Sequence, residues 1–203
     1  MTLDYKAILH FLFPLSEDEQ ILVAATLEDF LPKVAGQSRE PIISLLHYSD
    51  AHVRSAIHLV KFHNHVHARK LLAHTLVTYL SAHTTHEAIL VPVPLSAKRK
   101  RERGYNQVSV VIQQANLRAI LVENILMRKK HTIPQTSLAR TERLQNVTNA
   151  FGISNHKIAL EKISGKHIVL IDDVTTTGAT LEEAKAALLP LQPASVTCIA
   201  LAH

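Results

Sequence analysis

Two aspartates and a run of threonines follow a short apolar segment near the end of the chain. The segment reads Asp172-Asp173-Val174-Thr175-Thr176-Thr177-Gly178-Ala179-Thr180. Small residues allow the backbone to bend tightly, and the hydroxyl groups add hydrogen-bond donors to the amides of the bend. A helix that follows would contribute unpaired N–H groups and its dipole, both of which attract anions. The turn is therefore suited to hold a phosphate.

Asp172 and Asp173 repel a phosphate but can accept hydrogen bonds from hydroxyl groups. A ligand that carries vicinal hydroxyls beside a phosphate, such as a ribose 5-phosphate, satisfies both halves of the segment. Other phosphate motifs fit poorly, because a Walker A loop requires a Lys-Ser/Thr pair and a dinucleotide fingerprint requires spaced glycines, whereas Gly178 stands alone. The alternative is an ordinary Thr/Gly turn in which an aspartate caps the helix.

A second chemical feature is the basic run at 98–103, where five of the six residues are Lys or Arg. It follows Val93-Pro94-Leu95-Ser96, which ends a short apolar segment. Such a run could stabilise the growing charge of a departing pyrophosphate, provided that the donors are preorganised. Two alternatives stay open, namely a solvated basic turn and a nonspecific nucleic-acid patch.

A βαβ unit must position these groups. The apolar run 166–171, a helix with Leu181, Ala184, Leu188 and Leu191 on one face, and the apolar run 194–202 predict strand, helix and strand in a parallel sheet. Upstream, the patterns predict the following elements: helices over about 50–62, 66–82, 106–121 and 137–149, and strands over 88–94 and 123–127. Ser16 and Glu19 form a capping box that predicts an earlier helix. The fold class is therefore α/β, with a mostly parallel central sheet flanked by helices.

The composition restricts the class of protein. The chain has 203 residues, of which 47% are hydrophobic and 19% are charged, so it can bury a core and is not intrinsically disordered. The single cysteine, Cys198, excludes a disulfide framework or a cysteine-based zinc module and predicts a reducing compartment, the cytoplasm. No apolar run approaches the roughly 18 residues of a membrane helix, and no signal peptide is expected. The net charge of +5 favours polyanionic partners.

Residues 169–180 resemble the phosphoribosyl-pyrophosphate signature of type I phosphoribosyltransferases. Other residues narrow this resemblance to the ComF (competence protein F-like) family of that superfamily. They are Val91 to Leu95, Arg103-Gly104-Tyr105-Asn106-Gln107, Arg128, Thr132, Gln135, Arg143, Asn146, Phe151, Tyr48, Arg54, Ile57, Lys61 and Phe62. The resemblance covers roughly 46–203. It implies a type I phosphoribosyltransferase-like domain over 46–203. Residues 1–45, which the resemblance does not cover, are expected to form a small N-terminal helical cap.

The resemblance implies an enzyme that transfers a phosphoribosyl group from phosphoribosyl pyrophosphate to a nitrogen acceptor and releases pyrophosphate. The implied catalytic residues are Asp172, Asp173 and Arg143. The implied substrate-binding residues are Val174, Thr175, Thr176, Thr177, Gly178, Ala179, Thr180, Pro94, Leu95, Lys98, Arg103, Thr132, Gln135 and Lys61. Residues 128–149 resemble a flexible loop that closes over the substrate. Mg²⁺ is expected to bind through substrate oxygens, without a dedicated protein cage.

A second class of function stays open. The chain could be a non-catalytic accessory protein of DNA uptake or repair that senses phosphoribosyl pyrophosphate or a nucleotide and binds single-stranded DNA. The low aromatic content of 4% weakens the single-strand reading, because base stacking supplies much of that affinity. Many ComF-like proteins begin with a four-cysteine zinc module, which this chain does not contain. The acceptor and a homodimeric state are left open.

The stretch that contains His58, His63, His65 and His67 could suggest a zinc site, because imidazole is a common metal ligand. It coincides with the junction of two predicted helices, and no carboxylate lies nearby in the sequence to orient the imidazoles. Surface or capping roles are therefore the better interpretation of these histidines.

Overall fold

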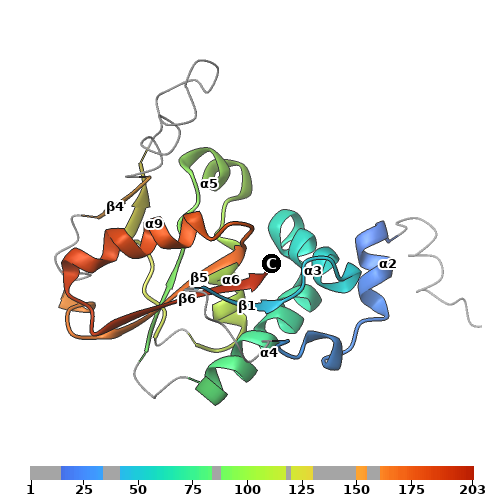
Figure 1. The fold of residues 1–203 in the computed structure, drawn as a ribbon. Coiled ribbons are helices and arrows are strands. Elements are labelled where there is room, and N and C mark those ends of the chain that lie inside the picture. Colours follow the sequence, from blue (N-terminus) through green and yellow to red (C-terminus); the bar gives the residue numbers. More distant parts are fainter. Residues whose placement is uncertain (1–14, 34–41, 84–87, 118–119, 130–149, 155–160) are drawn as a thin grey trace, which may run out of the picture.

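Among the residues that the structure describes, four parallel strands form the central sheet. Figure 1 shows how the helices surround this sheet. In spatial order the strands are β1 (Ile42–Leu46), β6 (Ser195–Ala202), β5 (His167–Val174) and β2 (Ile89–Pro92). The computed structural model describes residues 15–33, 42–83, 88–117, 120–129, 150–154 and 161–203. The predicted α/β class with a parallel sheet is confirmed.

Strand β5 shows why both faces of the sheet are covered. Ile168 and Leu170 belong to one buried cluster, whereas Val169 and Ile171 belong to another. Because side chains alternate along a strand, the two clusters lie on opposite faces of the sheet. An almost continuous apolar run with this arrangement is typical of a central parallel strand.

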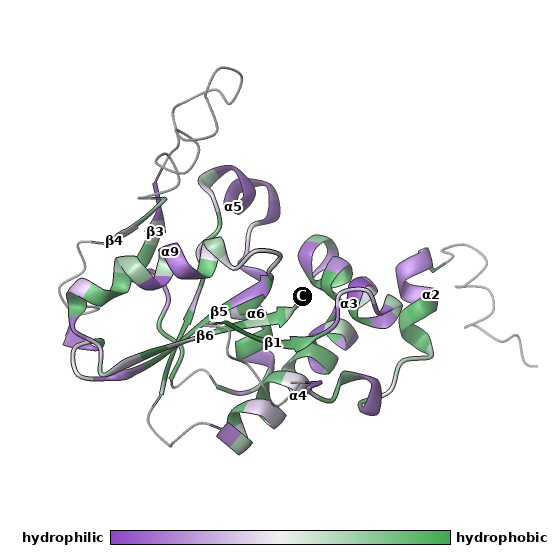
Figure 2. Cartoon of the chain, viewed as in Figure 1, coloured by the Kyte–Doolittle hydropathy of each residue, from purple (hydrophilic) through white to green (hydrophobic). Residues whose placement is uncertain are grey.

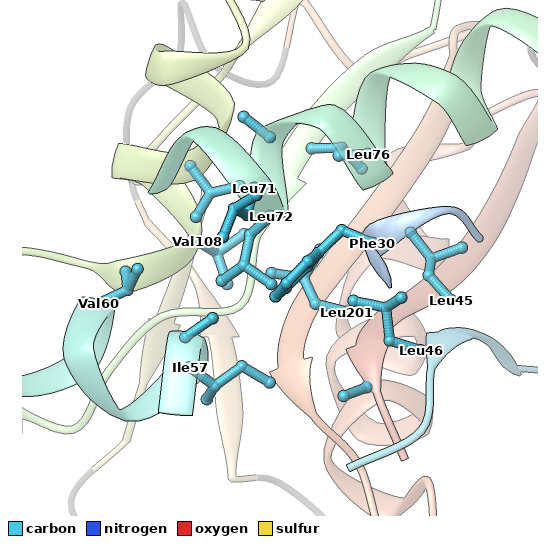
Figure 3. Close-up of a cluster of buried hydrophobic side chains, with 14 of the residues drawn as sticks. Phe30, Leu45, Leu46, Ile57, Val60, Leu71, Leu72, Leu76, Val108 and Leu201 are labelled. Carbon is cyan, nitrogen blue, oxygen red and sulfur yellow. The ribbon is translucent and has the colours of Figure 1, made fainter. Parts of the chain in front are cut away.

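Three helices cover the face that carries Val169 and Ile171. They are α3 (Ala51–His63), α4 (Val66–His83) and α6 (Gln107–Gln114). The segment before β1 adds helix α2 (Glu17–Val23), which begins at the predicted capping box, and the short helix η1 (Glu28–Phe30). Phe30 is fully buried, and Figure 3 shows its ring among the side chains of Leu72 and Leu201.

The N-terminal segment is therefore joined to the core. The hydroxyl of Thr75 in α4 donates a hydrogen bond of 2.6 Å to the carbonyl of Phe30, and the amide of Lys33 donates one of 2.7 Å to the carbonyl of Leu45. The sequence suggested a boundary between cap and domain after residue 45. Strand β1 spans this position, so residues 42–45, on the cap side of the boundary, already belong to the sheet.

Helix α9 (Ala179–Leu188), extended by η3 (Leu189–Leu191), covers the opposite face. Beside it lies a two-stranded antiparallel ribbon of β3 (Leu126–Arg128) and β4 (Phe151–Ile153). Ile125, Leu126 and Phe151 join the same buried cluster as Leu181 of α9. β3 and β4 are separated in the sequence by residues 130–149, which the structure does not describe. The predicted helix over 137–149 therefore lies outside the described residues.

The structure contains one helix for which the sequence predicted no element, and it shortens one predicted helix. The basic run forms a helix, α5 (Ala97–Arg103), because the Ser96 hydroxyl caps the amide of Arg99 and Gly104 ends the helix with φ +80°. Helix α6 ends at Gln114 rather than near 121, because Asn116 adopts a left-handed conformation with φ +60°. Among the described helices, none combines the length and apolar character that crossing a membrane requires.

Candidate functional site

The ends of β2 and β5 place two loops side by side. Pro92 pairs with Ile171 in the parallel ladder, and the amide of Val93 donates a hydrogen bond of 2.8 Å to the carbonyl of Ile171. Because both strands run in the same direction, the loop 93–96 and the turn 175–178 leave the same edge of the sheet. This edge is where open α/β sheets bind ligands.

The turn after β5 is held by its own hydroxyl groups and by β6. The amide of Thr175 donates to the carbonyl of Ala202 at 3.0 Å, and the amide of Gly178 donates to Oγ1 of Thr175 at 3.0 Å. Gly178 caps α9 with φ +79°, and a Cβ at this position would overlap Cδ1 of Ile42. Within the described part of the chain, the amides of Thr176 and Thr177 have no hydrogen-bond acceptor, so they are available to an anion.

Asp173 is buried at the end of β5, and protein groups surround its carboxylate. Oδ2 lies 2.8 Å from Nζ of Lys61 in α3 and accepts a hydrogen bond of 2.9 Å from Nε2 of Gln107 in α6. Oδ1 accepts a hydrogen bond of 2.7 Å from the amide of Val174. A buried carboxylate with an ion pair and two hydrogen bonds is well satisfied by the protein alone.

Asp172 has a different environment. Its side chain is half-buried, and the amide of Asp173 donates a hydrogen bond of 2.8 Å to its Oδ1. Burial, followed by repulsion from the Asp173 carboxylate, raises the pKa of Asp172 to about 7, although the Asp173 amide and Lys61 favour the charged form. Near neutral pH this carboxyl can therefore accept a hydrogen bond from a hydroxyl group when it is charged, or donate one to a hydroxyl group when it is protonated.

The segment Arg103 to Gln107 holds α3 against the site. The hydroxyl of Tyr105 donates to the carbonyl of Val60 at 2.6 Å and accepts from the amide of Asn64 at 3.0 Å, at the C-terminal end of α3. The guanidinium of Arg103 donates to Oε1 of Gln107 and lies 5.5 Å from the ring centre of Phe62. The position of Lys61 beside Asp173 thus depends on both α3 and the start of α6.

The predicted residues are only partly brought together. Lys61, Asp172 and Asp173 meet at one point, and Arg103 joins them through Gln107. Pro94 and Leu95 are half-buried in the loop after β2, whereas Lys98 is exposed on α5 and pairs with Glu102 at 3.8 Å. Figure 2 shows α5 as a mainly hydrophilic helix. Thr132, Gln135 and Arg143 lie outside the described residues.

Comparison with known proteins identifies the family. Residues 88–203 match the phosphoribosyl transferase domain, and this match covers more than half of the chain. The chain belongs to the phosphoribosyl transferase domain family. Its curated relatives support the predicted resemblance to ComF-like proteins.

Competence protein F of Haemophilus influenzae is 36% identical over 130 residues, which are 61% of this chain and 56% of that protein. Competence protein ComFC of Bacillus subtilis is 33% identical over 112 residues, 55% of this chain and 42% of that protein. DNA utilization protein YhgH of Escherichia coli K12 is 32% identical over 102 residues, 49% of this chain and 42% of that protein. The chain spans about half the length of the curated relatives it matches.

A solved structure of Trypanosoma cruzi hypoxanthine phosphoribosyl transferase aligns with a TM-score of 0.38 at 11% identity, covering 83% of this chain and 69% of that one. The confirmed fold class, a mostly parallel sheet flanked by helices, agrees with the phosphoribosyl transferase domain family.

The carboxyl groups of this phosphoribosyl transferase domain can be tested against the metal expected from its family. No cluster of three or more His, Cys, Asp or Glu side chains in the described ranges could hold a metal ion. The Asp173 oxygens are already bonded, so Asp172 is the acid with remaining capacity at this edge. One carboxylate with substrate oxygens and water is a donor set that suits Mg²⁺, so the residues present fit this ion.

Two histidines of the α3–α4 junction, His58 and His65, pair with acids of helix α2. Nδ1 of His58 lies 2.6 Å from Oδ2 of Asp18, and Nε2 of His65 lies 3.9 Å from Oε1 of Glu19. His65 also caps α4, because its Nδ1 accepts a hydrogen bond of 3.4 Å from the amide of Ala68. These imidazoles have structural partners, and those partners come from a segment distant in sequence.

Gln107 and Tyr105 are the residues that sequence reasoning did not assign to the site. Both belong to the string Arg103 to Gln107, which carries part of the family resemblance. In the sequence, Tyr105 and Gln107 lie on either side of Asn106, a residue type that often caps helices. In the structure the Asn106 side chain does accept hydrogen bonds from the amides of Val108 and Ser109. The asparagine predicts where the helix starts, but nothing in this string predicts the contact of Gln107 with Asp173.

Proposed function

We propose that this chain binds phosphoribosyl pyrophosphate at the carboxyl edge of β2 and β5 and transfers its phosphoribosyl group to a nitrogen acceptor, releasing pyrophosphate. One observation carries the proposal: Asp172 is a half-buried carboxyl with hydrogen-bonding capacity, and it lies three residues before a turn with two available amides. A ribose phosphate has hydroxyl groups for the first and a phosphate for the second.

The two aspartates take different roles in this proposal. Asp172 accepts hydrogen bonds from the ribose hydroxyls and so orients the sugar. Asp173 holds Lys61 and Gln107 and thereby fixes the wall of the site, because its oxygens are already bonded to protein groups. The 5-phosphate is bound by the turn Val174 to Gly178 and by the start of α9 at Ala179 and Thr180.

The diphosphate lies on the other side, near Val93 to Ser96. Arg103, and Lys98 on the exposed helix α5, supply positive charge on this side, and Thr132, Gln135 and Arg143 are proposed to add contacts when the substrate binds. When bound, Mg²⁺ neutralises charge on the diphosphate, and Asp172 is the protein group that would hold it. Exclusion of water protects the electron-deficient sugar carbon from hydrolysis.

Isothermal titration with phosphoribosyl pyrophosphate and Mg²⁺ tests the binding step. We expect binding by the unmodified chain and at least a tenfold loss of affinity in D172N. D18N removes a carboxylate on α2 that pairs with His58, so it is the matched control and should bind as well as the unmodified chain. Absence of binding at millimolar ligand would overturn the proposal.

A screen for pyrophosphate release against nucleobases and amines then identifies the acceptor. We expect release with one acceptor class in the unmodified chain and none in D172N. Binding without release for every acceptor would favour the non-catalytic alternative, a sensor of phosphoribosyl pyrophosphate or a nucleotide.

One surface feature favours that alternative function in DNA uptake or repair. Phe62 is 60% exposed, and Arg103, at the end of the basic helix α5, lies over its ring. An exposed aromatic ring beside basic side chains is a usual binding element for single-stranded DNA. Fluorescence anisotropy with a single-stranded oligonucleotide should show weaker binding for F62A than for the unmodified chain, and equal binding by both would contradict this function.

A further inference from the structure

His203 follows β6 and contacts the turn after β5. Its amide donates a hydrogen bond of 3.1 Å to the carbonyl of Leu46, and its carbonyl accepts one of 2.8 Å from the amide of Tyr48. The backbone of His203 is therefore fixed by the residues at the end of β1. From this fixed position its side chain reaches the turn, where Nε2 lies 3.1 Å from the carbonyl oxygen of Thr176.

The direction of this hydrogen bond is settled by chemistry. A carbonyl oxygen can only accept, so Nε2 of His203 must carry the hydrogen. Both the neutral tautomer with hydrogen on Nε2 and the charged imidazolium meet this requirement. The contact thus directs the Thr176 carbonyl towards His203.

The same contact sets the direction of the next amide. The described chain contains no cis peptide bond, and in a planar trans peptide the C=O and N–H groups point in opposite directions. The N–H of Thr177 therefore points away from His203. It has no acceptor among the described residues. Bonding at the carbonyl also polarises the peptide, which strengthens its N–H as a donor.

We propose that His203 is a positioning residue for the phosphate-binding turn: it holds the Thr176–Thr177 peptide so that the Thr177 amide donates to the phosphate of a sugar phosphate. This inference rests on the proposed function. It adds a residue from the end of β6 to a turn whose other donors all come from the β5–α9 connection.

Two small ligands separate a positioning role from a general structural one. Ribose 5-phosphate needs the turn for its phosphate, whereas inorganic pyrophosphate with Mg²⁺ uses the loop after β2. We expect H203A to weaken ribose 5-phosphate by about 3- to 10-fold, the effect of one hydrogen bond, and to leave pyrophosphate affinity within about twofold. H203Q retains a side-chain N–H donor and should bind ribose 5-phosphate more tightly than H203A.

His167 provides the matched control, because it lies at the opposite end of β5 and its Nδ1 is 2.8 Å from Oγ of Ser195. H167A should leave both affinities unchanged. Equal ribose 5-phosphate affinity in H203A and the unmodified chain would overturn the positioning role. So would equal losses of ribose 5-phosphate and pyrophosphate affinity in H203A. Either result would leave the proposed function intact. A failure of the unmodified chain to bind either ligand would overturn the proposed function and this inference together.

Discussion

The ammonium group of Lys61 lies 2.8 Å from the Asp173 carboxylate and so ties the end of α3 to the end of β5. The two residues are far apart in sequence, and both side chains are largely buried. Gln107 donates to the same carboxylate oxygen, so three elements meet at one buried charge. A packed charge of this kind makes the site sensitive to the loss of any partner.

K61M should therefore reduce the free energy of unfolding by about 3 kcal/mol, because it leaves a buried carboxylate without its counter-ion. Urea denaturation measures this loss. D173N in the same background should recover part of it, since the uncompensated charge is then removed. K98M is the control: its exposed pair with Glu102 predicts a change within about 0.5 kcal/mol. Similar losses in K61M and K98M would contradict the prediction.

The Asp172 carboxyl predicts an unusual pH dependence. Burial raises its pKa to about 7 in the folded chain, above 3.8 in the unfolded chain. The folded state then binds more protons between these values, so this group lowers the free energy of unfolding as pH rises from about 4 to about 7. D172N should be more stable than the unmodified chain at pH 8, by roughly 1–4 kcal/mol, and equally stable at pH 4.

Urea denaturation of both proteins at the two pH values measures this difference. A D172N variant that is less stable than the unmodified chain at pH 8 would show that the charged carboxylate is favourably held in the folded state.

Substitution of Gly178 by alanine should destabilise the fold for two reasons. G178A should reduce the free energy of unfolding by about 2–3 kcal/mol, because alanine is strained at φ +79° and its Cβ overlaps Ile42. The glycine at 165 separates the two effects, since it has φ +70° but open space around the Cβ position. G165A should therefore cost only about 1 kcal/mol.

I42V removes the Cδ1 atom that the new Cβ would overlap. The double variant G178A/I42V should recover stability relative to G178A, as measured by thermal or urea denaturation. If it is no more stable than G178A, backbone strain alone accounts for the loss.

Tyr105 predicts a local loss of stability at the end of α3. Y105F removes the hydroxyl that bonds to the Val60 carbonyl and the Asn64 amide, so we expect a loss of about 1–2 kcal/mol. Hydrogen exchange should show faster exchange of the Asn64 amide, which then keeps only its hydrogen bond to the carbonyl of Leu59. Tyr48 has no hydrogen bond from its hydroxyl to the described residues, which makes Y48F the control with no comparable loss. Unchanged exchange at Asn64 in Y105F would contradict the prediction.

The parts of the fold that were predictable depend on local patterns. The strand at β5, the turn Asp172 to Thr180 and helix α9 follow from an apolar run, turn residues and helical spacing within one short stretch. The end of α6 was missed because apolar residues continue past Asn116, whose left-handed conformation stops the helix. The helix at 97–103 was missed because the dense charge concealed the capping roles of Ser96 and Gly104.

The candidate site was less predictable, because its contacts join distant segments. The hydrogen bond from Gln107 to Asp173 spans 66 residues, and the one from Tyr105 to Val60 spans 45. No local spacing indicates such pairs. Likewise, His58 and His65 pair with acids of α2, which lie far upstream and could not be inferred from the histidine stretch alone.

The strand order has a consequence for synthesis of the chain on the ribosome. In the four-stranded sheet, β1 pairs with β6 and β2 pairs with β5, so every ladder needs a strand that begins at or after His167. Until those residues emerge, α3 and α4 have no sheet on which to bury their apolar faces. β1 and β2 therefore stay unpaired until β5 and β6 have been synthesised, and the sheet can form only after that point.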